Sequence, residues 1–237
     1  MKILALDSSG MVASVAVVED EILLGEYTVN YKKTHSQTLL PMLDEVARMI
    51  ELNLDSVDAI AVAAGPGSFT GLRIGSATAK GLGLALDKPL VSVPTVEALA
   101  YNLYGTRGVI CPMMDARRNQ VYAGLYSFSE GKFQVISGQE AIGVEELLGK
   151  VNELGQSVTF LGDGVPVYRD VIAEVCQVSY NFAPAHVNRQ RAAAVAVLGG
   201  NYYKEGRVQN ARDHRPEYLR LSQAERERMQ REEAQRD

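Results

Sequence analysis

Cysteine is scarce in this chain, which has only Cys111 and Cys176 among its 237 residues. The two lie far apart and neither belongs to a Cys-x-x-Cys pair, so the sequence predicts neither a disulfide framework nor a zinc knuckle. The first apolar run, residues 3–6, ends at Asp7 and is too short for the core of a signal peptide. We therefore expect a cytoplasmic protein without membrane association.

Positive charge is also in short supply, since the formal net charge is -5 and the sequence pI is about 5.4. A dedicated nucleic-acid surface needs a basic patch to bind phosphates. The composition therefore argues against direct nucleic-acid binding, and any RNA would be held by another subunit.

Several catalytic motifs are missing. The chain has no G-x-x-x-x-G-K-[ST] loop, and no G-x-G-x-x-G follows its first strand. Ser68 lacks a G-x-S-x-G elbow, so a structural serine at a helix N-terminus is the better interpretation. His35, His186 and His214 are isolated from one another and from cysteine, and we predict no metal site.

What is present is a pattern of strands and helices typical of an α/β protein. Alternating residues predict three strands joined by hairpins, at 2–8, 13–18 and 22–29. Apolar residues at helical spacing predict a helix over 36–51, with Thr34 and Gln37 as its capping box. A buried strand, 58–64, then leads into a glycine-rich loop, 65–71, and a largely apolar helix over 70–86.

The same plan recurs later in the chain. A strand over 109–114 ends at Asp115 as the first strand ends at Asp7, and residues 157–166 again deliver a strand into a glycine turn. An apolar helix is predicted over 192–203. We expect subdomains at 1–104 and 105–216, followed by a polar tail or helix at 217–237.

The glycine loop and the strand-end carboxylates predict a possible nucleotide-phosphate cleft. Backbone N–H groups at a helix N-terminus can face phosphate oxygens, and a carboxylate can face a metal ion or water. The alternative, which the residues leave open, is that the glycines only turn the chain and the aspartate only caps a strand. The candidate cleft residues are Asp7, Ser8, Gly65, Gly67 and Asp115.

The helix over 70–86 also predicts a contact with a partner. Its small residues recur every four positions and form a ridge, and helical glycines weaken a helix by about 1 kcal/mol each relative to alanine. Packing against the chain's own sheet is the alternative explanation. With the helix over 36–51, the predicted interface consists of Leu39, Leu43, Val46, Ile50, Gly71, Leu72, Gly75, Ala79 and Gly83.

Five segments spread over the chain resemble the TsaB family. The most specific is Ala64-Gly65-Pro66-Gly67-Ser68-Phe69-Thr70-Gly71-Leu72-Arg73-Ile74-Gly75. The others are Leu4-Ala5-Leu6-Asp7-Ser8-Ser9, His35-Ser36-Gln37, Asp115-Ala116-Arg117-Arg118 and Pro216-Glu217-Tyr218-Leu219-Arg220. The combination is specific, although each motif alone is not.

The resemblance implies an actin-like ATPase (ASKHA, RNase H-like) fold with two related subdomains, each with a mixed sheet and flanking helices. It implies a non-catalytic subunit that binds and activates TsaD, the transferase that makes N6-threonylcarbamoyladenosine at position 37 of tRNA. TsaE, an ATPase, joins the larger complex. We expect a homodimer when the chain is alone, tRNA contact only through the partner, and no cofactor on this chain alone, with ATP or ADP and Mg²⁺ at the interface of the complex.

One difference from the catalytic relative, TsaD, argues against catalysis by this chain. TsaD-type proteins have an H-x-x-x-H metal motif after the corresponding strand, whereas this chain has Thr95 and Leu99, which cannot bind iron or zinc in place of histidine. A free-standing actin-like ATPase or phosphotransferase is the alternative, with Asp115 or Asp163 as the second carboxylate beside Asp7. A peptidase has no nucleophile, base or metal constellation to support it.

Overall fold

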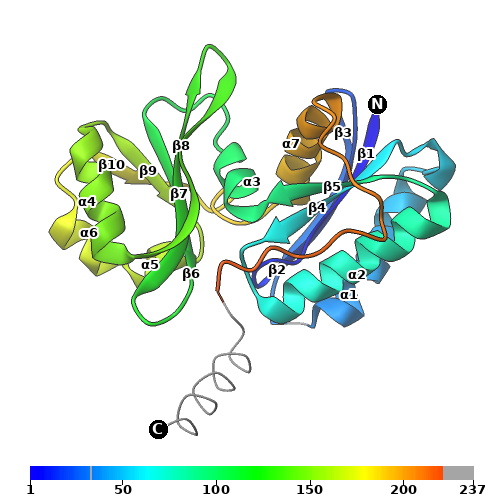
Figure 1. Cartoon of the computed structure of the whole chain (residues 1–237), viewed down its shortest axis with the longest axis horizontal. Coiled ribbons are helices and arrows are strands. Elements are labelled where there is room, and N and C mark those ends of the chain that lie inside the picture. Colours follow the sequence, from blue (N-terminus) through cyan, green and yellow to red (C-terminus); the bar gives the residue numbers. More distant parts are fainter. Residues whose placement is uncertain (33, 221–237) are drawn as a thin grey trace, which may run out of the picture.

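The computed structural model describes residues 1–32 and 34–220, and these form two halves, each built on a five-stranded sheet (Figure 1). The first sheet has the order β3-β2-β1-β4-β5, and the second has the order β10-β9-β6-β7-β8. The first contains β1 (Lys2–Asp7), β2 (Val12–Glu19), β3 (Ile22–Asn30), β4 (Ala59–Gly65) and β5 (Leu90–Pro94). The second contains β6 (Val109–Asp115), β7 (Gln120–Ser129), β8 (Lys132–Gly143), β9 (Val158–Leu161) and β10 (Tyr180–Phe182).

The two sheets have the same topology. In each, the first three strands are antiparallel neighbours. A fourth strand pairs parallel to the first on its other side, and a fifth pairs parallel to the fourth. Asp7 and Asp115 are the last residues of the matching strands β1 and β6. The internal duplication predicted from the sequence is therefore confirmed.

Helices cover both faces of the first sheet because its central strands are apolar on both sides. Leu4 and Leu6 of β1 face α1 (His35–Met49) and α2 (Phe69–Leu86), whereas Ile3 and Ala5 face α7 (Ala192–Lys204). Such burial on both faces is typical of the parallel part of an α/β sheet. The predicted helix over 36–51 begins at His35 with Thr34 as its N-cap residue, but the Thr34 side chain makes no capping hydrogen bond, so the predicted capping box is wrong.

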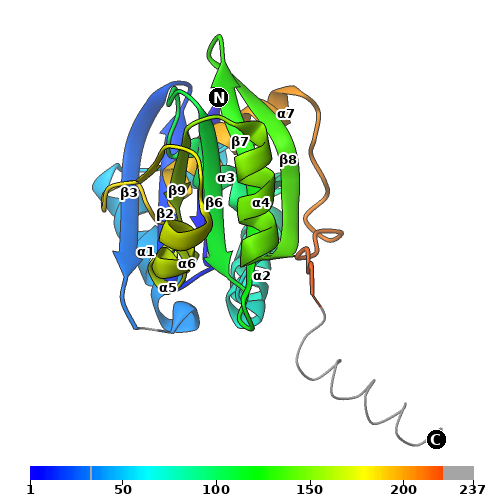
Figure 2. The same cartoon turned by 90° about the vertical axis from the view of Figure 1, so that its left-hand side faces the viewer.

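The second sheet is covered on one face by α4 (Val144–Leu154) and α6 (Arg169–Val175), with the short α5 (Gly164–Val167) near the end of β6 (Figure 2). Its other face packs against α3 (Thr95–Tyr101), whose Val96, Leu99 and Ala100 meet Ile110 and Tyr126. A single-turn 3-10 helix, η1 (Leu54–Ser56), precedes β4. None of the helices in the described residues has the length and hydrophobicity to cross a membrane.

The boundary between the halves differs from the one expected. The sequence predicts 105–216 as the second subdomain, but α7 and the segment after it return to the first sheet, and Leu90 of β5 pairs with Gln209. In the other direction, α3 lies at the end of the expected first subdomain and packs on the second sheet. Hydrophobic periodicity identifies α7 correctly as an apolar helix, but it carries no information about which sheet the helix covers. Of the expected tail 217–237, residues 221–237 lie outside the described residues.

Candidate functional site

Asp7 lies at the end of β1 and is fully buried. Its Oδ1 accepts hydrogen bonds from the Ser9 amide at 2.9 Å and the Ser9 hydroxyl at 2.6 Å. Its Oδ2 has no hydrogen-bond partner among the described residues. Burial raises the pKa of Asp7 to about 6, against the opposing effect of the two Ser9 hydrogen bonds. The carboxylate therefore faces the protein interior rather than solvent.

The glycine loop packs directly on the turn that follows Asp7. Ser8 Oγ donates to the Gly71 carbonyl at 2.8 Å, and the Ser68 amide donates to the Ser9 carbonyl at 2.6 Å. A Cβ at Gly67 would collide with that same Ser9 carbonyl, which explains the need for glycine there. Ser68 is the N-cap of α2, as the structural interpretation predicted. The structure thus brings Asp7, Ser8, Gly65 and Gly67 together, but the chain itself fills the space between the two turns.

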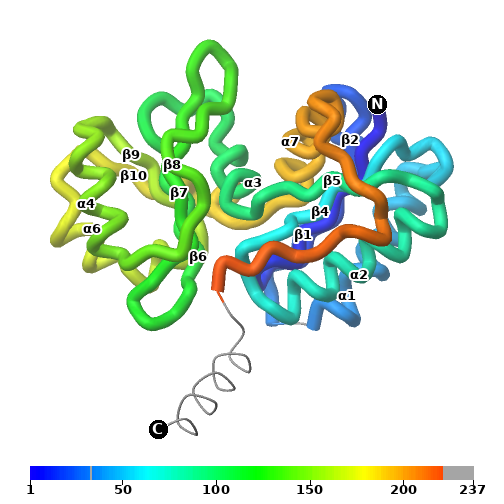
Figure 3. Tube along the Cα trace, in the orientation of Figure 1, coloured from blue at the N-terminus to red at the C-terminus, as the bar shows by residue number. Residues whose placement is uncertain are grey.

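A segment from the end of the described chain closes over the glycine loop. Residues 211–220, hereafter the strap, run along α2 toward the other half (Figure 3). The Glu217 amide donates to the Ala64 carbonyl at 2.7 Å, and Gly65, at φ +124°, has no room for a Cβ beneath the Glu217 carbonyl. Lys80 Nζ holds the start of the strap through the carbonyls of Arg212 and His214, at 2.9 and 3.1 Å. Sequence reasoning missed this cover because the strap has no periodic pattern.

Thr95 and Gln139 hold the same loop from the other side. Thr95 Oγ1 accepts the Gly65 amide at 3.1 Å, and Gln139 of β8 donates to the Gly65 carbonyl at 3.1 Å and to Glu217 at 3.2 Å. Leu99 is buried in the apolar cluster between α3 and the second sheet. Thr95 and Leu99 therefore serve the packing of the loop and the core.

Asp115 and Asp7 share no hydrogen bond among the described residues, and the predicted cleft between them stays a prediction. Asp115 lies in the second sheet, where Oδ1 accepts the Arg117 amide at 2.8 Å and the Tyr168 hydroxyl at 3.3 Å. Its own amide donates to Asp163 at 3.1 Å, and burial raises the pKa of Asp163. Asp115 and Asp163 thus repeat, around the matching strand end, the local turn geometry that surrounds Asp7.

The predicted partner interface is also wrong in its choice of residues. Leu39, Leu43 and Val46 are buried against the chain's own first sheet, and Ile50 packs partly against the same cluster. On α2, a Cβ at Gly75 would lie 2.5 Å from Ser8 Oγ, and one at Gly83 would lie 2.7 Å from Leu90. The remaining members, Gly71, Leu72 and Ala79, are buried as well. The small-residue ridge therefore serves close packing on the chain's own sheet, the alternative that the sequence left open.

These residues do not fit a magnesium-nucleotide complex in this arrangement. Asp7 is sealed from solvent, Asp115 is directed into its own cluster, and the amides of Gly65 and Ser68 are bound within the chain. Within residues 1–32 and 34–220, no three His, Cys, Asp or Glu side chains gather in a way that could hold a metal ion. The geometry supports packing between a glycine loop and a turn, rather than phosphate binding by this chain alone.

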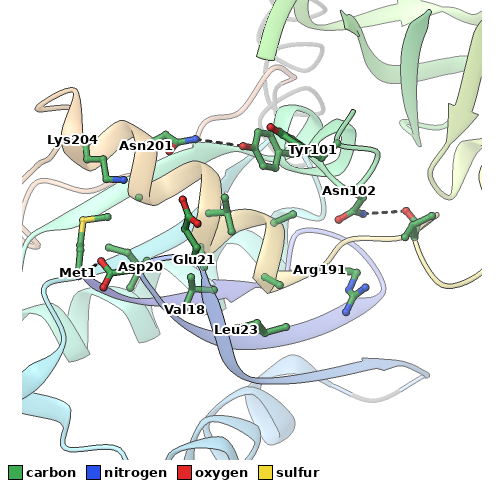
Figure 4. Close-up of a pocket in the computed structure, with 18 residues that line it drawn as sticks. Met1, Val18, Asp20, Glu21, Leu23, Tyr101, Asn102, Arg191, Asn201 and Lys204 are labelled. Carbon is green, nitrogen blue, oxygen red and sulfur yellow. Dashed lines mark hydrogen bonds and ion pairs between the residues drawn. The ribbon is translucent and has the colours of Figure 1, made fainter. Parts of the chain in front are cut away.

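A cavity of about 560 Å³ lies elsewhere, along α7, where this helix meets the start of β1, the β2–β3 turn and the end of α3 (Figure 4). Met1, Ile3 of β1, Leu23 and Val197 line it, together with the exposed residues Lys204 and Glu21. Met1 is at the opposite end of β1 from Asp7, and a six-residue strand spans roughly 20 Å. The cavity therefore does not belong to the glycine-loop site. The sequence does not predict it, because periodicity leaves α7 assigned to the other sheet.

Two sheets of identical topology, with a glycine loop packed on the first strand turn, define an actin-like α/β protein of the ASKHA type. The family model described as "TsaD: tRNA N6-adenosine threonylcarbamoyltransferase" matches residues 23–228. The Bacillus subtilis "tRNA threonylcarbamoyladenosine biosynthesis protein TsaB" is 32% identical over 225 residues, which are 95% of this chain and 96% of that protein. The chain belongs to the TsaB (YeaZ-like) family.

Further relatives agree with this membership. The Escherichia coli protein of the same description is 29% identical over 174 residues, 72% of this chain and 75% of that protein. Among solved structures, YeaZ from Pseudomonas aeruginosa superposes with a TM-score of 0.79 at 27% identity and covers 92% of this chain and 99% of that one. The similarity thus extends over both halves of the fold.

Proposed function

We propose that this chain is a non-catalytic subunit that binds and activates a TsaD-type threonylcarbamoyltransferase in the synthesis of tRNA N6-threonylcarbamoyladenosine. The names of its relatives supply the pathway. The observation that carries the non-catalytic role is the closed glycine-loop site, in which Asp7 is buried and Glu217 covers Gly65. The cytosol, expected from the unpaired Cys111 and Cys176, is the compartment that the proposal requires.

The same closed site weighs against the phosphotransferase alternative. A phosphoryl-transfer enzyme needs carboxylates that can reach metal ions and phosphate, and here Asp7 and Asp115 lie in separate buried or half-buried clusters. The proposal therefore assigns ATP or ADP with Mg²⁺ to the interface of the complex rather than to this chain alone. TsaE is the additional ATPase subunit of the proposed complex.

We place the partner interface on the solvent-facing side of α1 and α2. Leu40, Met49 and Leu84 are more than half exposed there, which is unusual for side chains of this size. Ala77, Gly81 and Ala85 recur every four residues along the exposed side of α2, and a Cβ at Gly81 would meet nothing within 4 Å. No contact among residues 1–32 and 34–220 explains this glycine, whereas close approach by a partner helix does. Alone, the chain pairs with a second copy through this face.

The test compares two helical glycines at which an added side chain would have open space. Gly81→Leu adds bulk to the proposed interface, and Gly149→Leu adds the same bulk in α4, where a Cβ also meets nothing within 4 Å. We expect wild type and Gly149→Leu to form a heterodimer with TsaD, measured by native mass spectrometry, and to stimulate threonylcarbamoyl transfer to tRNA. Gly81→Leu should stay folded and do neither.

Different results would contradict the proposed interface and the proposed function. Normal complex formation by Gly81→Leu would show that the interface lies elsewhere. A wild-type chain that neither binds TsaD nor changes its turnover would remove the proposed function itself. ATP turnover by the isolated chain, unaffected by TsaD, would favour the phosphotransferase alternative.

A further inference from the structure

Arginine and aromatic side chains gather where three distant segments of the chain meet. The segments are the N-terminal end of α2, the turn between β6 and β7, and the end of the strap, which lies between the other two (Figure 1). We call this surface the arginine patch, and its members are Phe69, Arg73, Arg117, Arg118, Tyr218 and Arg220.

Direct contacts join the members of the arginine patch. The Phe69 and Tyr218 rings stack with their centroids 4.4 Å apart. The Arg73 guanidinium lies 4.1 Å from the Phe69 ring centroid, and its Nε donates to the Tyr218 hydroxyl at 3.3 Å. Two residues further along the strap, Arg220 donates to the carbonyl of Ala116, which directly precedes Arg117. The patch is therefore one continuous surface that spans both halves of the protein.

Three of the four cations of the patch face solvent, and the fourth, Arg220, is half-buried and bound to the Ala116 carbonyl. The Arg117 side chain is 87% exposed, and Arg73 and Arg118 are exposed as well. Arg117 and Arg118 both adopt left-handed backbone conformations, with φ of +65° and +58°, which are uncommon for side chains of this size. The turn thus presents two consecutive exposed arginines.

Three carboxylates lie beside the arginines. Asp115 is directed inward by the Arg117 amide and the Tyr168 hydroxyl, and Asp163 lies behind it. Glu217 accepts a hydrogen bond from Gln139. Asp115 also lies 3.4 Å from the Arg117 guanidinium, but its side chain is 13% exposed against 87% for Arg117, so the positive member of this pair is the one that faces solvent. The net charge of -5 therefore conceals a local excess of exposed positive charge.

We infer that the arginine patch binds RNA. All four of its cations are arginines, whose planar guanidinium groups bind phosphate in a bidentate manner and stack on bases. The exposed ring of Tyr218 beside them suits an unpaired base of a loop. The inference rests on the proposed function. It revises our expectation from the net charge that tRNA is held only by the partner. Because α2 carries both Gly81 and Arg73, the RNA would lie across the boundary between the two proteins.

The test uses the full chain, alone and mixed with TsaD, and a fluorescein-labelled RNA hairpin with a single-stranded loop. Arg117→Gln combined with Arg118→Gln removes two charges from the patch. The matched control, Arg107→Gln combined with Lys132→Gln, removes two exposed charges near the opposite ends of β6 and β7. Fluorescence anisotropy over a range of salt concentrations gives the affinity and its salt dependence, and native mass spectrometry gives the composition of each complex.

We expect the patch variant to bind the hairpin about tenfold more weakly, with a salt slope smaller by about 1 for each phosphate that is no longer neutralised. The control should match wild type, and both variants should still bind TsaD. Equal affinity and slope in all three proteins would overturn the inference. So would a patch variant that keeps its RNA affinity but no longer binds TsaD, because the patch would then be a protein-binding surface. A wild-type chain that binds the hairpin but not TsaD would refute the proposed function and leave RNA binding by the patch standing.

Discussion

Gln139, on the last long strand of the second sheet, donates its side-chain amide to the carbonyl of Gly65, which ends β4 in the first sheet. The same amide reaches Glu217 of the strap, and its oxygen accepts the Val96 amide at 3.3 Å. One side chain thus joins both halves, the glycine loop and the strap.

Gln139→Ala should destabilise the protein by roughly 1 to 3 kcal/mol, because the buried Gly65 carbonyl and the Val96 amide lose a partner. Hydrogen exchange at the Glu217 amide should accelerate at the same time. Urea unfolding and exchange mass spectrometry measure the two effects. Gln134→Ala, an exposed position on the same strand, is the control and should stay within about 0.5 kcal/mol of wild type. Unchanged exchange at Glu217 would mean that the strap is held without Gln139.

Thr95→Val should destabilise the chain by a similar amount, roughly 1 to 3 kcal/mol, since the buried Gly65 amide loses its acceptor while the side chain keeps its volume. Thr95→Ser retains the hydroxyl and serves as the matched control. Thermal unfolding should therefore rank the variants as wild type, then Thr95→Ser, then Thr95→Val. Equal stability of Thr95→Val and Thr95→Ser would contradict a role for this hydrogen bond.

The buried Asp7 should make the stability of the folded protein depend on pH. Its pKa is about 6 in the folded protein and near 3.8 when the chain is unfolded, because burial disfavours the charged form. Well below pH 3.8 both states are protonated and there is no penalty. As pH rises from about 4 to 6, the unfolded chain loses this proton first, so the folded state loses stability, on the order of 3 kcal/mol in total.

Asp7→Asn keeps the acceptor for Ser9 and removes the charge, so it should stabilise the protein near pH 7 and have little effect at pH 4. The difference in free energy of unfolding between variant and wild type, measured across this range, checks the sign. Asp213→Asn, at an exposed position, should change stability by less than about 0.5 kcal/mol at every pH. A gain from Asp7→Asn that is independent of pH would refute the burial of a charged group.

Two glycines of α2 should respond in opposite ways. Gly75→Ala brings a Cβ to 2.5 Å from Ser8 Oγ, in a buried site, and should destabilise the fold. Gly81→Ala enters open space in a helix and should stabilise the monomer by roughly 0.5 to 1 kcal/mol. Urea unfolding of the isolated chain measures the change in stability for each variant. Equal effects at both positions would show that α2 does not pack on the turn after Asp7.

The contrast between Gly75 and Gly81 also shows what the sequence could predict. Four-residue spacing identifies α2 and its small-residue ridge correctly, because helical periodicity determines which residues share a face. It does not identify which face meets the sheet. The opposite side of α2 carries its own small residues, Ala77, Gly81 and Ala85, so neither face stands out by polarity. The predicted interface therefore fell on the buried side.

The sequence analysis does not predict α4, β8 or the strap, and the reason differs for each. In α4, Val144, Leu147, Leu148 and Val151 recur at helical spacing, and this signal is present in the sequence. In contrast, β8 pairs with β7 through irregular register, which obscures the alternation expected of a strand. The strap is held by backbone and side-chain hydrogen bonds between residues far apart in the sequence, such as Glu217 to Ala64. Local patterns do not encode such contacts.

The position of α7 determines the order in which the two halves of the protein finish folding on the ribosome. Ile3, Ala5, Ala59 and Ala61 are among the first core residues to be synthesised, yet the helix that covers their face begins only at Ala192. The second sheet lies entirely between these segments of the chain and has its own apolar cluster. We therefore expect the N-terminal sheet to finish folding after the C-terminal one, with one apolar face uncovered for most of translation.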